Sequence, residues 1–544
     1  MKILFVATRK NVNPDHRELY EMQFMTEALG FQRSILDLGI LTVAACTPKG
    51  VDVQIVDEYF DEVPYDTDAD LIALSAKTSC VTHAYAVAAR FKAQGKPVVL
   101  GGIHASLKPE EALEHVDFVV TGEAELVWPQ FVEQFHKGEA PRLTKAEDFP
   151  PMAEIPFPDY ANLDPGNFLF HQIQTTRGCP FMCRFCSVPD IAGNTFRFKP
   201  VERVVQEIRQ RPKAGLIRER MKAIYFVDDN FISRTKYTND LLDALIPLYE
   251  GGELEEWSAE TTLNVVRDEA MLEKFARAGC STLIIGFESI SEETLLSMNK
   301  KVNFCLSYPA AIEKIHKLGM AIVGNFIVGF DTDPISVFRD IRDFVDDNNI
   351  LYPFYSILTP MPGTKLHDDY VAEDRLDHTD WQYYDTRHVV YEPKLMSREQ
   401  LMDGYVWLYE QSYASDRALK RLENYWRQYR QTQSSFVQHA FIKWRLRKFM
   451  KTGSPRFQHY LKKGWEILKR KDVTTDVGQL LYYYDAAHFC DFLDGYRSPN
   501  FAENARLFER AVTVPEGDDS RQVMQWDTSR VKKTEARLSG KQAS

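Results

Sequence analysis

Two stretches of this chain repeat one pattern, in which a short apolar run is followed by a segment with helical periodicity. In the first stretch the helical segment 82–95 places Ala84, Val87, Ala88 and Phe91 on one face. Alternating strands and helices are typical of a parallel sheet with helices on both faces. The runs that we predict to be strands are 2–7, 51–56, 71–75, 97–102 and 116–120. The pattern therefore predicts a doubly wound, Rossmann-like α/β domain in residues 1–135.

The second stretch, residues 167–365, repeats the pattern six times. Each apolar run ends in polar residues or glycine, and the chemistry of a barrel of parallel strands takes place at those strand ends. The predicted strands are 168–174, 223–227, 257–263, 282–287, 322–328 and 353–358. Six such units predict a partial (β/α)6 TIM barrel.

The rest of the chain divides by composition. Residues 136–166 are rich in proline and acidic residues, which prevent regular helix or central strand, so we predict a linker. Segment 366–512 reads as a mostly helical extension, in which Ser397 to Gln400 form a capping box. Its aromatic residues at 376–395 fit either a core or a cover over the barrel mouth. The polar residues 513–544 predict a disordered tail.

Overall composition bounds the class of protein. The chain has 544 residues, of which 44% are hydrophobic and 26% charged, as expected for a soluble globular protein of several domains. No apolar run is long enough to span a bilayer, and the first residues enter a strand, so we expect a cytoplasmic protein. The net charge of −12 argues against a nucleic-acid partner.

Three of the eight cysteines, Cys179, Cys183 and Cys186, lie within eight positions directly after a predicted strand. Structural zinc normally takes four protein ligands, and no second cysteine pair is near. Three cysteines on one turn-rich loop are also unusual as buried packing residues. The third interpretation is an iron–sulfur cluster with three protein ligands and one iron open to another molecule.

The spacing Cys-x-x-x-Cys-x-x-Cys, with Phe185 before the last cysteine, resembles the radical SAM superfamily. The resemblance implies a [4Fe–4S] cluster whose open iron chelates S-adenosylmethionine (SAM). It also implies cleavage of SAM to methionine and a 5′-deoxyadenosyl radical, with an electron donor such as flavodoxin or ferredoxin. The protein would position the cofactor and exclude competing reactions.

Several predicted strand ends resemble SAM-binding segments of that superfamily. The aspartate pair after the second strand corresponds to the segment near the methionine amino group, and the fourth and fifth strands correspond to those near ribose and adenine. Helix capping is the alternative for these acidic residues, and Asp333 before Pro334 fits capping better. The residues that the resemblance assigns to SAM are Asp228, Asp229, Glu288, Ser289 and Asn325.

The stretch from Gly101 to Glu125 resembles the cobalamin-binding domain that precedes the barrel in one class of radical SAM enzymes. The Asp-x-His-x-x-Gly signature that supplies a cobalt ligand elsewhere is absent, and Asp15-His16 has the wrong spacing, so we expect no such histidine on cobalt. A simple tight turn at the paired glycines, or a cobalamin-type fold without its ligand, is the alternative. The residues assigned to cobalamin are Ser75, Thr78, Gly101 and Gly102.

Residues 437–471 carry eleven Lys and Arg residues against one acid, Glu466, with aromatic residues interleaved. Such a run is usually a solvated helix face. It is also typical of an interfacial helix drawn to anionic lipid, which would give peripheral membrane contact and favours a lipid-like or anionic small-molecule substrate.

The resemblance predicts a cobalamin-dependent radical SAM enzyme that methylates an unactivated carbon. Cyclisation or rearrangement without methyl transfer is the alternative reaction, and a non-catalytic iron–sulfur or cobalamin sensor is the alternative of another class. The methylthiotransferase branch fits less well, because neither its three additional amino-terminal cysteines nor a small carboxy-terminal RNA-binding barrel is evident. No catalytic side chain is assigned.

Overall fold

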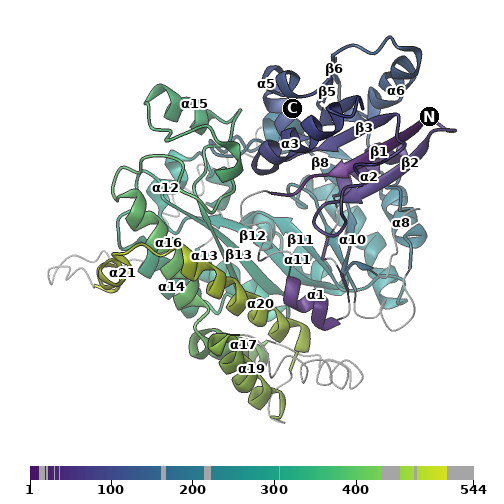
Figure 1. Cartoon of the computed structure of the whole chain (residues 1–544). Coiled ribbons are helices and arrows are strands. Elements are labelled where there is room, and N and C mark those ends of the chain that lie inside the picture. Colours follow the sequence, from purple (N-terminus) through teal and green to yellow (C-terminus); the bar gives the residue numbers. More distant parts are fainter. Residues whose placement is uncertain are drawn as a thin grey trace. The chain divides into compact units, whose positions relative to one another are not determined.

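The computed structural model describes residues 1–510 except 11–18, 20–21, 30, 33, 36, 161–166, 214–221, 305–306, 430–453 and 471–474. Figure 1 shows the whole chain, which divides into two compact units. The first comprises Met1–Asp229 and Thr359–Glu392, and the second comprises Asn230–Leu358 and Pro393–Ser544. The predicted tail therefore lies outside the described residues.

The first unit contains a parallel sheet of six strands. Its order is β2 (Asp52–Asp57), β1 (Lys2–Ala7), β3 (Leu71–Ser75), β4 (Val98–Gly101), β5 (Phe118–Thr121) and β6 (Leu143–Lys145). The order reverses between β1 and β3, and ligands of doubly wound sheets bind in the crevice at such a point. The five predicted strands are confirmed. β6 lies within the segment predicted to be a linker, where its three residues show no apolar run.

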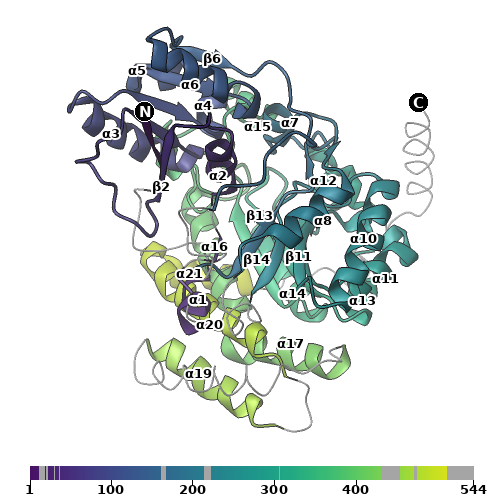
Figure 2. The same ribbon diagram turned by 90° about the vertical axis from the view of Figure 1, so that its right-hand side faces the viewer.

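Helices cover both faces of this sheet (Figure 2). On one face α2 (Leu38–Ala45) and α6 (Trp128–Lys137) pack on inward residues of β1 and β3 such as Phe5 and Ala73. The helices α3 (Val81–Lys92) and α5 (Pro109–His115) pack on each other and on β3 to β5. The shorter helices of this part are α1 (Gln23–Leu29) and α4 (Ile103–Leu107).

The cysteine loop also belongs to the first unit. It follows β7 (Phe170–Ile173), which pairs in parallel with β10 (Ala223–Phe226). A two-stranded antiparallel ribbon, β8 (Thr176–Arg177) and β9 (Arg197–Phe198), closes the loop at its base. The helices here are α7 (Val188–Ala192), α8 (Val201–Gln210) and, in the returning segment, α15 (Lys365–Ala372).

The second unit continues the alternation of strand and helix. Its parallel strands are β11 (Trp257–Thr261), β12 (Cys280–Glu288), β13 (Ala321–Val328) and β14 (Tyr352–Ile357). The helices between and before them are α10 (Thr235–Glu250), α11 (Glu269–Arg277), α12 (Glu292–Ser297), α13 (Tyr308–Lys317) and α14 (Val337–Asp347). With β7 and β10 these make the six predicted strands, and the predicted fold class is confirmed.

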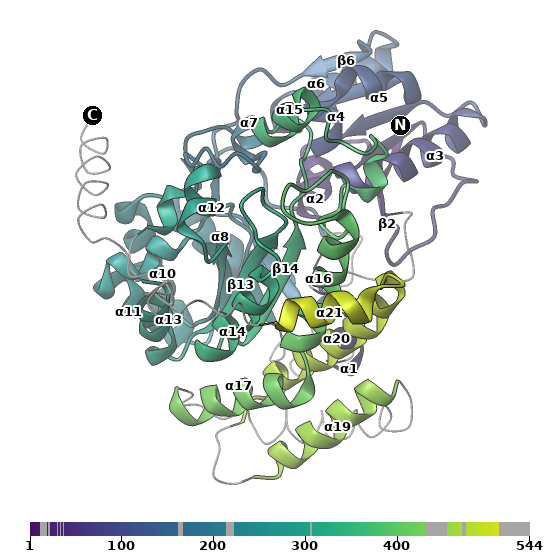
Figure 3. The same ribbon diagram turned by 90° about the vertical axis from the view of Figure 1, so that its left-hand side faces the viewer.

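The carboxy-terminal part of this unit is helical, as predicted (Figure 3). Ser397 and Gln400 form the predicted capping box of the first helix. That helix is core, because the Tyr409 hydroxyl donates to the Tyr355 carbonyl at 3.0 Å and the Tyr413 hydroxyl donates to the Pro353 carbonyl at 2.8 Å. The helices are α16 (Arg398–Ser412), α17 (Ser415–Gln428), α19 (Pro455–Leu468), α20 (Val477–Leu493) and α21 (Phe501–Glu509).

The basic segment 437–471 is described only over 454–470. There Arg456 pairs with Glu410 and Asp491, and Arg470 pairs with Glu423. Among the described residues no helix is both long and apolar enough to cross a membrane. Residues 437–453 and 471, about half of the segment to which lipid contact was assigned, lie outside the described part.

Candidate functional site

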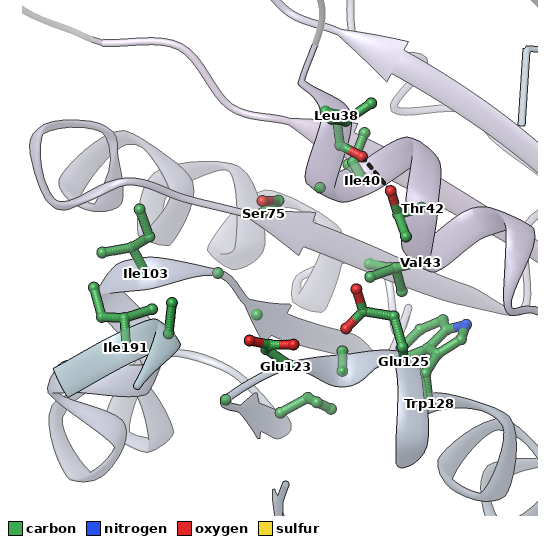
Figure 4. A pocket seen from close by; sticks show the side chains of 18 of the residues that line it. Leu38, Ile40, Thr42, Val43, Ser75, Ile103, Glu123, Glu125, Trp128 and Ile191 are labelled. Atoms are coloured by element: carbon green, nitrogen blue, oxygen red, sulfur yellow. Dashed lines mark hydrogen bonds between the residues drawn. The ribbon is translucent and has the colours of Figure 1, made fainter. Parts of the chain in front are cut away.

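A pocket of about 400 Å³ opens at the carboxyl edge of the first sheet, at the point where the strand order reverses (Figure 4). All of its lining residues belong to the first unit. The apolar wall includes Phe5, Val43, Ala73, Val99, Val120 and Trp128, and the polar wall includes Ser75, Glu123, Glu125, Gln174, Arg177 and Asp229. A largely apolar pocket with a few polar groups on one side is typical of a cofactor site.

Three of the four residues assigned to cobalamin, Ser75, Gly101 and Gly102, line this pocket. Gly102 has φ +95°, and a Cβ on it would lie 3.0 Å from the Ala76 carbonyl oxygen. The turn therefore needs glycine, as the tight-turn interpretation requires, and it also lines the pocket. Thr78 is buried in a short 3-10 helix, Thr78–Cys80, and is not among the lining residues.

Among the described lining residues there is no His, Cys or Met. His104, from the same Gly-Gly-Ile-His motif, is fully buried, with its Nε2 3.4 Å from the Glu111 carboxylate. Asp15 and His16 lie outside the described residues. The described wall therefore offers cobalt no imidazole or sulfur ligand.

The three cysteines lie on the loop between β8 and β9 and form no disulfide. Cys183 is buried, and Cys179 and Cys186 are partly exposed. Among the described residues, which include all three, no three His, Cys, Asp or Glu side chains converge on one metal-ion position. Three thiolates on one loop can each bind a different iron of a cluster.

Two aspartates at the end of β10 hold the start of the loop. The Asp228 carboxylate accepts from the backbone N–H groups of Thr175 at 2.6 Å and Thr176 at 2.9 Å, and from the Thr175 hydroxyl. Asp229 accepts from the Gly178 N–H at 3.2 Å and lines the pocket. Burial raises the pKa of Asp228 to about 6 and also raises that of Asp229. Asp228 thus anchors the loop, whereas Asp229 also faces the pocket.

The other residues assigned to SAM belong to the second unit. Glu288 ends β12 with φ +62° and pairs with Lys300 at 2.8 Å. The Ser289 hydroxyl accepts a hydrogen bond from the Ser291 N–H at 3.0 Å. Asn325 lies in β13, in the stretch where β13 pairs with β12. A ribose hydroxyl at Glu288 would share that carboxylate with Lys300.

The interpretation of Asp333 as a helix cap is wrong. Its carboxylate accepts from the N–H groups of Gly329 at 2.9 Å and Phe330 at 3.0 Å, while the N-cap residue of α14 is Ser336. Asp333 therefore folds the loop after β13 back on itself. Burial raises its pKa to about 7.

The sequence did not reveal an ion-pair cluster at the polar wall of the pocket. Arg177 pairs with Glu123 and with Glu125, each at 2.7 Å, and Arg197 donates to Glu123 at 3.0 Å. The sequence does contain acidic residues at 123 and 125 and arginines near the cysteines, and the Gly122–Glu125 stretch carried part of the family resemblance. Their positions in the sequence did not indicate that these side chains form ion pairs.

Comparison with known proteins agrees with this geometry. A family model of the radical SAM superfamily matches residues 173–345, and one of the B12 binding domain matches residues 31–132. Bacteriochlorophyllide d C-12(1)-methyltransferase of Chlorobaculum tepidum is 34% identical over 396 residues, which are 71% of this chain and 85% of that protein. This chain belongs to the B12-binding methyltransferases of the radical SAM superfamily.

A second relative and a solved structure agree with this. Bacteriochlorophyllide d C-8(2)-methyltransferase of the same organism is 31% identical, over 68% of this chain and 84% of that protein. The solved structure of OxsB, a cobalamin-dependent SAM radical enzyme with aqua-cobalamin bound, has a TM-score of 0.58 at 15% identity, over 93% of this chain and 79% of that one. The likeness to OxsB is one of fold.

The family settles several expectations. The chain is an enzyme, which removes support from the sensor interpretation, and its family acts on small molecules. Its cofactors are the [4Fe–4S] cluster, SAM and cobalamin. The pocket and the cysteine loop are the parts of the first unit whose chemistry fits cobalamin and the cluster, respectively.

Proposed function

We propose that this radical SAM enzyme transfers a methyl group to an unactivated carbon of a small molecule. The observation that supports the proposal is that one polar wall lines the pocket and also contacts the cysteine loop. Arg177 and Asp229 line the pocket, while Arg177 lies two residues before Cys179 and Asp229 binds the Gly178 N–H. Such a shared wall suits a reaction that uses both groups.

In this proposal Cys179, Cys183 and Cys186 hold the cluster. When bound, the cluster and SAM supply a 5′-deoxyadenosyl radical, and methylcobalamin supplies the methyl group. Asp228 fixes the backbone at the start of the loop, and the apolar side chains around Phe5 and Trp128 exclude water from the pocket. We also propose that SAM is bound by Asp229, Glu288, Ser289 and Asn325. The two domains that we propose to hold the cofactors are residues 1–135 and 167–365.

The cobalamin fit rests on the pocket. Its volume of about 400 Å³ lies within the range of small-molecule and cofactor pockets. Gly101 and Gly102 leave the backbone bare at the rim, which allows a large flat ring to approach. With no His, Cys or Met among the described lining residues, we propose that no protein nitrogen or sulfur in this wall binds cobalt.

The substrate proposal comes from the relatives. Two of them are named for methylating carbons of bacteriochlorophyllide d, an apolar macrocycle with a carboxylate. We propose a substrate of that chemical class, which agrees with the expectation of a lipid-like or anionic molecule. The proposed electron donor is a flavodoxin or ferredoxin.

The test uses anaerobically reconstituted protein with SAM carrying a labelled methyl group, hydroxocobalamin, a chemical reductant and bacteriochlorophyllide d. We expect 5′-deoxyadenosine, S-adenosylhomocysteine and a labelled macrocycle, detected by mass spectrometry. The variant with all three cysteines changed to alanine should form none of these products. Deoxyadenosine without S-adenosylhomocysteine would contradict methyl transfer and favour cyclisation or rearrangement. Failure to retain corrin through gel filtration would contradict the cobalamin assignment.

A further inference from the structure

The cysteine loop is closed by a ribbon that brings two positive charges face to face. Arg177 of β8 is the direct partner of Arg197 of β9 in the antiparallel register. Like charges directly opposite each other destabilise a pair of strands. Both side chains are largely buried, with 14% and 18% of their surface exposed, so water screens their repulsion only weakly. Closing the loop therefore requires negative charge from elsewhere.

That charge comes from the loop that follows β5. Glu123 accepts from both arginines, from Arg177 at 2.7 Å and from Arg197 at 3.0 Å, while Glu125 accepts from Arg177 at 2.7 Å. The two glutamates are 8% and 7% exposed. Together these four residues form a cluster, here called the clamp, in which two arginines pair directly with two glutamates. Asp229 is the further acid beside it, bound to the Gly178 N–H.

The clamp also forms part of the pocket wall. Glu123, Glu125 and Arg177 line the pocket, and the two carboxylates are drawn within it in Figure 4. Arg197 also donates to the carbonyl of Ala192, the last residue of α7, at 3.1 Å. A molecule in the pocket and the loop of the cysteines thus contact the same side chains.

We propose that Glu123 is a positioning residue that closes the cluster loop by neutralising Arg177 and Arg197, and that it couples the loop to occupancy of the pocket. This inference rests on the proposed function, because it takes the pocket to hold cobalamin and the loop to hold the cluster. Ligand binding to the wall would stabilise the closed loop, and an assembled cluster would in turn favour ligand binding, because such coupling is reciprocal.

Removing one or both members of the Arg197–Glu123 ion pair tests the proposal. Glu123→Gln removes the carboxylate that pairs with Arg197 and leaves Arg177 paired with Glu125, whereas Glu123→Gln with Arg197→Gln removes both members of the Arg197–Glu123 pair and keeps the Arg177–Glu125 pair. If charge is the cause, the double variant is less impaired than the single one. If Glu123 only fills space, the second change adds damage, because Arg197 also binds the Ala192 carbonyl.

The measurement is the rate at which a chelator removes iron from anaerobically reconstituted full-length protein, with and without hydroxocobalamin. We expect Glu123→Gln to release iron about tenfold faster than wild type, because it leaves buried charge uncompensated. The double variant and Glu123→Asp should release iron more slowly than Glu123→Gln. Glu133→Gln, an exposed change on α6, is the matched control and should behave as wild type.

The second readout is the effect of hydroxocobalamin. It should slow iron release from the wild type and have a smaller effect on Glu123→Gln. The proposal is overturned if the double variant releases iron as fast as Glu123→Gln, or if hydroxocobalamin leaves wild-type release unchanged although it is bound. Wild-type protein that assembles no cluster or retains no corrin would instead contradict the proposed function.

Discussion

Gly178, directly before the first cluster cysteine, occupies a backbone conformation that other residues rarely adopt. Its φ is +85°, and a Cβ there would lie 2.8 Å from the Ala192 carbonyl oxygen and still closer to that of Thr195. We predict that Gly178→Ala destabilises the loop by more than the roughly 1–2 kcal/mol of the left-handed conformation alone. The reconstituted variant should hold less iron per chain and show less [4Fe–4S] absorbance.

Gly50→Ala is the control for this prediction. Gly50 has a similar φ of +90°, but no atom lies within 4 Å of the position of its Cβ. It therefore carries only the backbone cost, at a site far in sequence from the cysteines. Equal iron content in both variants would show that the carbonyl contacts at Gly178 do not matter for the loop.

Among individual residues, the sequence predicted those whose spacing is specific to one kind of chemistry. The three cysteines were found because their separation on one loop is specific. The clamp was not found, because Glu123 and Arg177 lie far apart in sequence and charged residues of both signs are common. Thr78 was assigned to cobalamin because its loop resembles that of the family, but it is buried in a short 3-10 helix and is not among the lining residues.

Elements were more predictable than contacts. Strands buried between two layers of helices must be apolar along their whole length, so runs such as 71–75 mark β3 directly. β6 escaped because it is a three-residue edge strand, in which only Leu143 is an apolar residue. The loop after β13 was misjudged because an aspartate before proline has the same local pattern whether it caps a helix or binds a loop.

That loop gives a prediction about pH. The folded-state pKa of Asp333 is raised by burial to about 7, above its usual value, so the folded protein binds this proton more tightly than the unfolded chain. Its contribution to stability is therefore full at acidic pH and is lost as the pH rises from about 4 to 7. Asp333→Asn has no such titration, so its melting temperature relative to wild type should increase over this range.

The size of the effect follows from the shift, on the order of 1.4 kcal/mol for each pKa unit. Differential scanning fluorimetry between pH 4.5 and 8 would measure it, with Asp416→Asn, an exposed change on α17, as the control. A melting difference between Asp333→Asn and wild type that stays constant over this range would contradict an ionising Asp333.

On the scale of the whole molecule, the first unit is built from two separate stretches of chain. Thr359–Glu392 returns to residues 1–229 after the last barrel strand. Its aromatic part packs in the first unit, where Trp381 lies 5.4 Å from the His104 ring, and Asp385 pairs with Lys10 at 3.3 Å. Local sequence patterns do not indicate that a segment packs against a part of the chain far away in sequence. The sequence therefore left two roles possible for the aromatic residues at 376–395, as core residues or as a cover over the barrel mouth.

The contact between Trp381 and Glu111 tests this arrangement. Trp381 Nε1 donates to both Glu111 carboxylate oxygens, at 2.9 and 3.0 Å. Although burial opposes it, hydrogen bonds from His104 and Trp381 lower the pKa of Glu111. A carboxylate with a lowered folded pKa stabilises the protein above its unfolded pKa, and this contribution is lost as the pH falls.

We therefore predict that Trp381→Phe destabilises the first unit by about 1.5–3 kcal/mol at pH 7, the range for a hydrogen bond to a charged group, and by less below pH 4.5. Thermal unfolding at both pH values would measure this. Tyr384→Phe is the control. The Tyr384 hydroxyl donates to the uncharged backbone carbonyl of His378 at 2.7 Å, so the destabilisation caused by losing this hydrogen bond should not depend on pH. A Trp381→Phe effect as large at pH 4 as at pH 7 would mean that ring packing, rather than the charged hydrogen bond, ties the returning segment to the amino-terminal sheet.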